Sequence, residues 1–96
     1  PNHTRVNRQI SFLYKRMKNW LKAVKIWEKE AEKSKLYALI ELAKWEEHHT
    51  KVYEKALDYT KQALKLVKTH YLVDYNQIEK LEHRKKRLKR KLASKS

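Results

Sequence analysis

The densest group of side chains that could do chemistry lies near the C-terminal end. Seven of eight consecutive positions are basic: Arg84, Lys85, Lys86, Arg87, Lys89, Arg90 and Lys91. Such a helix could neutralise phosphate groups and bind nucleic acid without sequence preference and with a steep salt dependence. Apolar residues at three- and four-residue spacing give the same segment one apolar face, formed by Ile78, Leu81, Leu88 and Leu92. A solubilising helix that caps a helical repeat has the same two faces, so both interpretations stay open.

A second chemical group is the sequence EEHH at residues 46–49. Adjacent histidines on a helix point about 100° apart, and a tetrahedral zinc site takes three or four ligands. Because the sequence places no further ligand, we predict no metal and a solvated helix end. Asp58, Asp74 and the glutamates are expected to be solvent-exposed charges. The sequence has no cysteine nucleophile, Gly-rich phosphate loop or recognisable Ser/His/acid set, so we expect no catalysis, cofactor or small-molecule substrate.

Composition predicts a small all-helical domain. The 96 residues include no Gly, no Cys and only one Pro, and 38% of them are charged; such a chain has few tight turns and no disulfide framework. The net charge of +14 is concentrated at the two ends, because residues 1–35 carry +7, residues 36–70 carry +1 and residues 71–96 carry +6. No apolar run is long enough to span a membrane. We expect a cytoplasmic domain. Since the first residue is Pro rather than Met, we also expect that the domain is cut from a longer protein.

Periodicity predicts five helices, at residues 2 or 4–17, 20–33, 36–48, 52–69 and 74–92. The first helix has one apolar face, formed by Val6, Ile10, Leu13, Tyr14 and Met17. Thr4, Ser34 and Asp74 are predicted to be N-caps. Asn19 is expected to take the positive φ that ends a helix when Gly is absent, and residues 48–51 are expected to form a polar turn. His70, Tyr71 and Leu72 would then join the last two helices.

An internal repeat connects these helices. Trp20, Ala23 and Val24 recur 33 residues later as Tyr53, Ala56 and Leu57, with Trp27 and Ala63 also at repeat positions. This pattern resembles the tetratricopeptide (TPR) repeat, whose period is about 34 residues. The resemblance implies an all-α, five-helix TPR-like α-solenoid, with two degenerate hairpins at residues 1–33 and 36–69 and a capping helix at residues 74–92.

The repeats depart from the TPR pattern at several positions. The family's first-helix glycine is Ser11 in one repeat and Ala43 in the other, Glu30 replaces a second-helix alanine, and the closing prolines are missing. A plain up-down helical bundle therefore remains the structural alternative. The segment MKNWLKAVKIWEK also resembles a basic amphipathic calmodulin-target or membrane-surface helix. Because Trp20, Val24 and Trp27 coincide with repeat positions, we assign them to the core.

The TPR resemblance also implies a groove lined by first-helix residues. Carried onto this sequence, its positions are Arg5, Arg8, Phe12, Lys15 and Arg16. Guanidinium groups pair with carboxylates or phosphates, and Phe can stack on a base. The corresponding positions of the second repeat are mixed in character: Tyr37, Ile40, Lys44, Glu47 and His48. A solvated polar helix face is the alternative interpretation.

Residues 36–92 resemble a narrower group. ELAKWEEHHTKVYEKALDYTKQALKL and the closing LEHRKKRLKRKL are similar to the C-terminal helical part of bacterial YprB-type proteins, a family with an RNase-H-like exonuclease domain. The nuclease acids of that family would lie in its other domain, so no catalytic residue is carried over. We predict a non-catalytic protein-interaction module, accessory to a larger protein, that binds an acidic segment of a partner or of its own missing domain. The alternative is a basic module that binds DNA or RNA for a nuclease domain.

Overall fold

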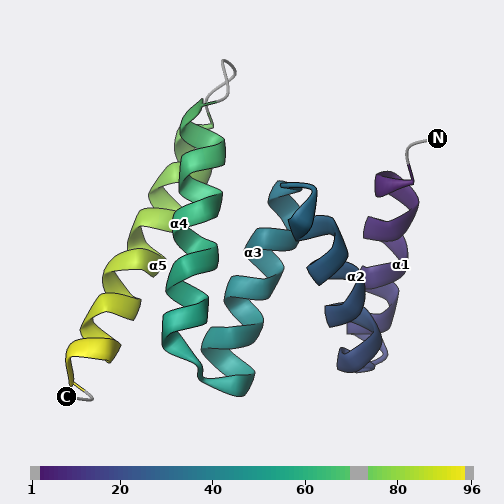
Figure 1. Ribbon diagram of the computed structural model, residues 1–96, viewed down its shortest axis with the longest axis horizontal. Coiled ribbons are helices and arrows are strands. Elements are labelled where there is room, and N and C mark those ends of the chain that lie inside the picture. The colour runs from purple at the N-terminus through teal and green to yellow at the C-terminus, as the bar shows by residue number, and fades with distance from the viewer. Residues whose placement is uncertain (1–2, 70–73, 95–96) are drawn as a thin grey trace.

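The computed structural model describes residues 3–69 and 74–94, and this part of the chain consists of helices and short connections, without strands (Figure 1). The predicted all-α class is therefore confirmed. The elements are α1 (Thr4–Arg16), α2 (Trp20–Glu32), α3 (Leu36–Trp45), the short π-helix η1 (Glu46–Thr50), α4 (Tyr53–Thr69) and α5 (Tyr75–Ser94). The predicted connection at His70, Tyr71 and Leu72 lies outside the described residues. None of the described helices is both long and apolar enough to cross a membrane.

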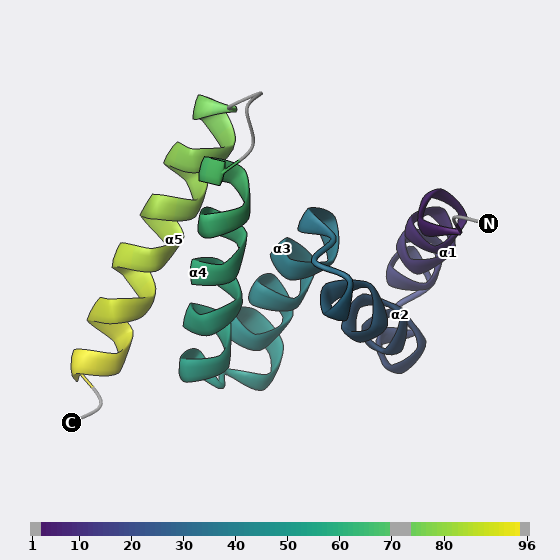
Figure 2. The same ribbon diagram turned by 45° about the horizontal axis from the view of Figure 1, so that its top comes forward.

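The helices form a row in chain order, and each packs mainly against its sequence neighbour. α1 and α5 stand at the two ends of this row, with α3 between them (Figures 1 and 2). The whole chain measures 43 × 34 × 20 Å. Because none of the described helices folds back over the row, α1, α3 and α5 can all contribute side chains to a shared surface.

The hydrophobic core consists of two clusters that meet on α3. One joins α3, α4 and α5 through Leu39, Ala63, Leu64, Val67 and Leu81. The other joins α2 and α3 through Ala23, Trp27, Ala38 and Leu42. Ala31 and Tyr59 contact both clusters. α3 therefore has apolar partners on both sides, which its unusually apolar sequence LYALIELAKW requires.

The predicted repeat positions lie at these helix contacts. Ala23, Trp27, Ala56 and Ala63 are buried, whereas Trp20, Val24, Tyr53 and Leu57 are partly buried. The two small residues at the family's glycine position, Ser11 and Ala43, are also fully buried. Small side chains at helix contacts allow close approach of the neighbouring backbones, so these residues determine how closely the helices in the row pack.

Three connections between helices use left-handed residues other than glycine: Lys18, Ser34 and Lys51, with φ of 58°, 58° and 60°. The prediction for Asn19 is wrong, because Lys18 takes the positive φ while Asn19 precedes α2 with φ of −89°. Ser34 is likewise not an N-cap; Lys35 is the residue before α3. A chain without Gly must place other residues in this strained region.

Two further helix ends differ from prediction and one agrees. Thr4 is the first residue of α1 and His3 precedes it, so Thr4 is not the N-cap. The polar turn expected at residues 48–51 is mostly helical, because the π-helix η1 continues α3 as far as Thr50. Asp74 is confirmed as a cap, since its Oδ1 accepts a hydrogen bond of 3.1 Å from the Gln77 backbone N–H.

Candidate functional site

A groove of about 670 Å³ runs across the faces of α1, α3 and α5. Its walls come from four helices and the α2–α3 connection: Thr4, Arg8, Phe12, Ser34, Lys35, Leu36, Tyr37, Ile40, Glu41, Lys44, Leu66, Gln77, Lys80, Leu81 and Arg84. Five of these residues are basic and only Glu41 is acidic. The groove therefore combines apolar lining residues with an excess of positive charge, a combination that attracts anionic groups.

Arg8 and two aromatic rings form the α1 side of the groove. The Arg8 Cζ lies 5.7 Å from the Phe12 ring centroid and 5.5 Å from that of Tyr37, and the two rings are 6.0 Å apart with an interplanar angle of 57°. These contacts are cation–π interactions, which leave the guanidinium N–H groups able to donate to another acceptor. Within the described chain no carboxylate pairs with Arg8.

Tyr37 is held in place by the buried carboxylate of Glu30. The Tyr37 hydroxyl donates a 2.8 Å hydrogen bond to Glu30 Oε1. Burial raises the pKa of Tyr37, and the hydrogen bond to Glu30 and the charge of that carboxylate raise it further. Tyr37 therefore stays a neutral donor at physiological pH, and its ring orientation in the groove is fixed by α2.

Glu41 links α1 to α3 at the groove. Its carboxylate oxygens lie 2.7 Å from Lys15 Nζ and 3.4 Å from Lys44 Nζ, and Lys15 Nζ also lies 5.9 Å from the Phe12 centroid. One buried carboxylate thus pairs with two lysines. Arg8, Lys35 and Lys80 line the same groove without an ion pair within the described residues, so positive charge there remains uncompensated.

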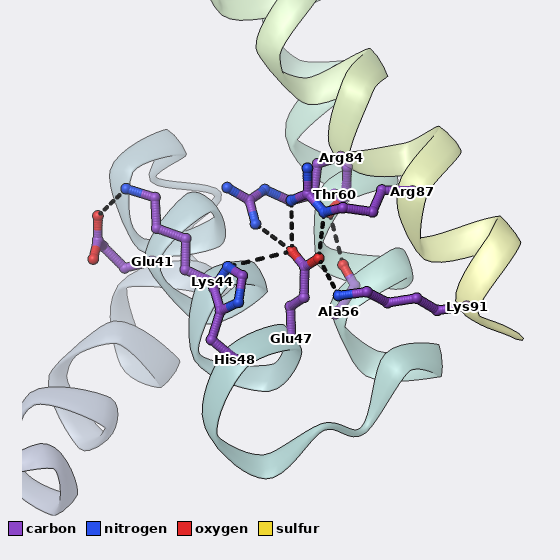
Figure 3. A network of polar contacts seen from close by, with 9 residues as sticks. All are labelled: Glu41, Lys44, Glu47, His48, Ala56, Thr60, Arg84, Arg87 and Lys91. Atoms are coloured by element: carbon purple, nitrogen blue, oxygen red, sulfur yellow. Dashed lines mark hydrogen bonds and ion pairs between the residues drawn. The ribbon is translucent and has the colours of Figure 1, made fainter.

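A buried ion network around Glu47 anchors α5 (Figure 3). The Glu47 side chain is fully buried in η1 and accepts hydrogen bonds from three cations of α5. Arg87 donates from Nε and Nη2 at 2.6 and 2.9 Å, Lys91 donates at 2.9 Å, and Arg84 donates through Nη1. His48 Nε2 lies 3.7 Å from the same carboxylate. A carboxylate can be buried as an ion where it accepts several charge-assisted hydrogen bonds, as Glu47 does.

The titration of this network follows from those contacts. Burial alone would raise the pKa of Glu47, but the hydrogen bonds from Arg87 and Lys91 and the charges of Arg87 and Arg84 lower it to about 2. Burial also lowers the pKa of His48, against the opposing charge of Glu47. Glu47 is therefore ionised and His48 neutral at pH 7.

The predicted groove residues of α1 do not all lie together. Arg8 and Phe12 line the groove, whereas Arg5 and Arg16 are exposed and are not among its lining residues. Lys15 lines an adjoining cavity of about 180 Å³, shared with three tryptophans and both histidines of η1. The second-repeat positions Tyr37, Ile40 and Lys44 also line the main groove. Sequence reasoning did not assign Lys35, Lys80 or Arg84 to the groove, because the repeat pattern gives no groove positions in the α2–α3 connection or in α5. Arg84 was predicted only as a nucleic-acid residue.

The predicted nucleic-acid residues of α5 divide into two sets. Arg84, Arg87 and Lys91 point to Glu47, and Lys85 is partly buried. The exposed members of the predicted set are Lys86, Lys89 and Arg90. The basic run of the sequence is therefore only partly available to an external ligand.

The run EEHH at residues 46–49 differs from the predicted solvated end. Both glutamates are buried, and so are Glu30 and Glu41, so the prediction that the glutamates are solvent charges is wrong for these four. The His49 ring packs 4.4 Å from Trp20 and 4.7 Å from Trp45 between ring centroids. Among the described residues, no group of three or more His, Asp or Glu is arranged to hold a metal ion.

The chain is thus all-helical and has a cationic surface groove. One curated protein is similar to it in sequence. Uncharacterized protein YprB of Bacillus subtilis (strain 168) is 38% identical over 89 residues. The alignment covers 88% of this chain and 21% of that protein, so the chain spans about a fifth of the relative's length. A scan against protein-family models gave no match. A search of solved structures also gave none.

Proposed function

We propose that this chain is a non-catalytic protein-interaction module whose groove binds an acidic, extended segment of a partner or of its own parent protein. The observation that carries the proposal is the composition of the groove, which is lined by five basic residues, two aromatic rings and one buried carboxylate. Three of the basic residues, Arg8, Lys35 and Lys80, have no ion pair within the described residues. Guanidinium and ammonium groups beside apolar side chains suit Asp and Glu side chains interspersed with apolar ones.

The proposed architecture is a TPR-like α-solenoid. The row of helices packed in chain order supports it, as do the buried small residues Ser11, Ala23, Ala43 and Ala56 at repeat positions. Solenoids present the first helix of each hairpin on a shared surface, and α1, α3 and α5 contribute most of the groove lining here. The similarity to a fifth of YprB supports an accessory role within a larger protein.

The groove can be tested with a charge reversal that leaves the fold intact. Arg8→Glu changes an exposed groove residue that has no ion pair to lose. We expect it to weaken binding of fluorescein-labelled acidic 12-residue peptides by about tenfold, since it removes one attraction and adds one repulsion worth together about 1.4 kcal/mol. Fluorescence anisotropy titrations of a peptide panel would measure the dissociation constants.

Arg16→Glu is the matched control for this test. It makes the same change of charge on the same helix, at an exposed residue outside the groove lining. We expect it to weaken binding by less than about threefold, because only long-range attraction changes. Equal losses in the two variants would mean that net charge alone attracts the peptides, and the groove assignment would then fail.

Nucleic-acid binding by α5 is the second candidate function, supported by the exposure of Lys86, Lys89 and Arg90. Replacing all three with Ser should abolish binding of single- and double-stranded DNA or RNA at low salt while acidic-peptide binding persists. Because these three residues offer three phosphate contacts, the slope of log K against log salt that they account for should be about −3 or shallower. Absence of binding at low salt would eliminate this candidate.

A further inference from the structure

Three apolar side chains of α1, together with Met17 at its C-cap, form an exposed stripe. Val6, Ile10, Leu13 and Met17 are 51%, 38%, 49% and 64% exposed. Their spacing of four, three and four residues places them on one face of the helix, over about three turns. The buried residue of α1 is Ser11, on another face. The stripe is thus an apolar surface that the described chain covers only in part.

This stripe is separate from the groove. At about 100° per residue, the centre of the stripe lies roughly 150° around the helix from Arg8 and Phe12, which line the groove. A ligand in the groove would therefore leave Ile10 and Leu13 exposed. The proposed groove function gives these side chains no role.

The shape of the stripe fits a single helix. The 4-3-4 spacing is that of the a and d positions of a heptad, and the stripe spans only about 60° of the helix surface. A helix that lies on a membrane surface usually has a broader apolar face and aromatic residues on it, whereas this stripe is narrow and entirely aliphatic. The stripe therefore fits another α-helix that packs along α1.

The charge around the stripe specifies the partner further. The first acidic residue of the chain is Glu28, and seven Lys or Arg residues precede it. On α1, Arg16 lies about 60° around the helix from the edge of the stripe, whereas Arg5 lies on the side of the groove. At the other edge of the stripe, Lys22 Nζ lies 5.5 Å from the Tyr14 ring centroid. A second copy of α1 would place like charges side by side, which is unfavourable.

We infer that the stripe Val6, Ile10, Leu13 and Met17 docks an acidic amphipathic helix, with an apolar a/d seam against the stripe and Glu or Asp at the flanking positions. This helix is a second ligand, on another face of α1 from the proposed groove. The inference does not require the groove function, because it depends on exposed aliphatic residues and the groove depends on Arg8 and its neighbours.

The test uses a labelled 21-residue peptide with Ile and Leu at a and d and Glu at e and g. Fluorescence anisotropy would measure its binding to the full 96-residue chain and to Ile10→Gln/Leu13→Gln. The double variant keeps the charge and helix, and its two exposed sites should tolerate Gln. We expect at least a tenfold loss of affinity, since two aliphatic side chains no longer become buried.

Three controls decide the outcome. A peptide of the same composition with its heptad scrambled should bind at least tenfold more weakly, and Arg8→Glu should weaken heptad-peptide binding by less than threefold. The Gln variant should bind the groove peptides normally, so the two proposals can fail separately. Any one of four results would overturn the inference. Two concern the peptide: equal binding of the scrambled peptide, or an unchanged affinity of the Gln variant. The other two are dimerisation through the stripe in sedimentation, and stripe-dependent binding to phosphatidylserine vesicles in place of the peptide.

Discussion

At the scale of single residues, buried glutamates determine much of this structure. Glu30, Glu41 and Glu47 each accept a side-chain hydrogen bond from a residue of another helix: Tyr37, Lys15 and the α5 cations, respectively. A buried carboxylate needs such partners, because an unpaired one would pay a large desolvation penalty. The glutamates therefore act as polar cross-links between helices.

Glu47 should make the fold sensitive to acid. Its pKa is about 2 in the folded protein against an ordinary value of 4.5, so the stabilisation is complete above pH 4.5 and is lost as the pH falls towards 2. The difference corresponds to up to about 3 kcal/mol. Urea unfolding curves at pH 7 and pH 2.5 would show this as a drop in unfolding free energy that Glu47→Gln does not share.

At pH 7, Glu47→Gln should lower the free energy of unfolding by about 2–3 kcal/mol, because three cations lose their buried partner. Glu54→Gln, at an exposed residue of α4, is the control and should change it by less than about 0.5 kcal/mol. A wild-type acid response equal to that of Glu47→Gln would show that other groups carry the pH dependence.

At the scale of the elements, the connections between helices store strain. Lys18, Ser34 and Lys51 each take φ near 60° in a chain that has no Gly. The left-handed conformation costs a residue with a Cβ about 1 kcal/mol, and glycine adopts it freely. Each of these residues follows a helical segment, at or beside the position where glycine is favoured.

Glycine at these connections should therefore stabilise the protein. We expect Lys18→Gly, Ser34→Gly and Lys51→Gly each to raise the free energy of unfolding by about 0.5–1 kcal/mol, measured by chemical denaturation. Lys25→Gly, at an exposed position inside α2, should lower it by about 1 kcal/mol. Destabilisation by all four substitutions would contradict the strain argument.

The sequence predicted the positions of the helices better than it predicted which residues of different helices contact one another. Periodicity placed α4 to within one residue at its start, and Asp74 was identified as a cap, because both signals are local. Periodicity also placed Ile10 and Leu13 on one face, but it carries no information on which helix covers that face. Likewise, the burial of Glu47 depends on cations some 40 positions away, and no local pattern reports such a contact.

At the scale of the whole molecule, α5 combines three roles. Leu81 and Leu88 are buried, and Leu81 belongs to the core cluster with α3 and α4. Arg84, Arg87 and Lys91 of the same helix bind Glu47. Lys80 and Arg84 also line the groove. α5 thus closes the core, neutralises a buried charge and forms one wall of the candidate site.

Removing most of α5 should consequently unfold the domain. A chain that ends at Leu81 loses the buried Leu88 and all three cations that bind Glu47. The combined loss is about 4–6 kcal/mol, comparable to the total stability of a small domain. Thermal unfolding followed by circular dichroism should lose its cooperative transition.

A chain that ends at Leu92 keeps both sets of contacts and should retain the transition within a few degrees. A cooperative transition in the shorter chain would show instead that α1–α4 fold independently, and α5 would then be only a dispensable cap.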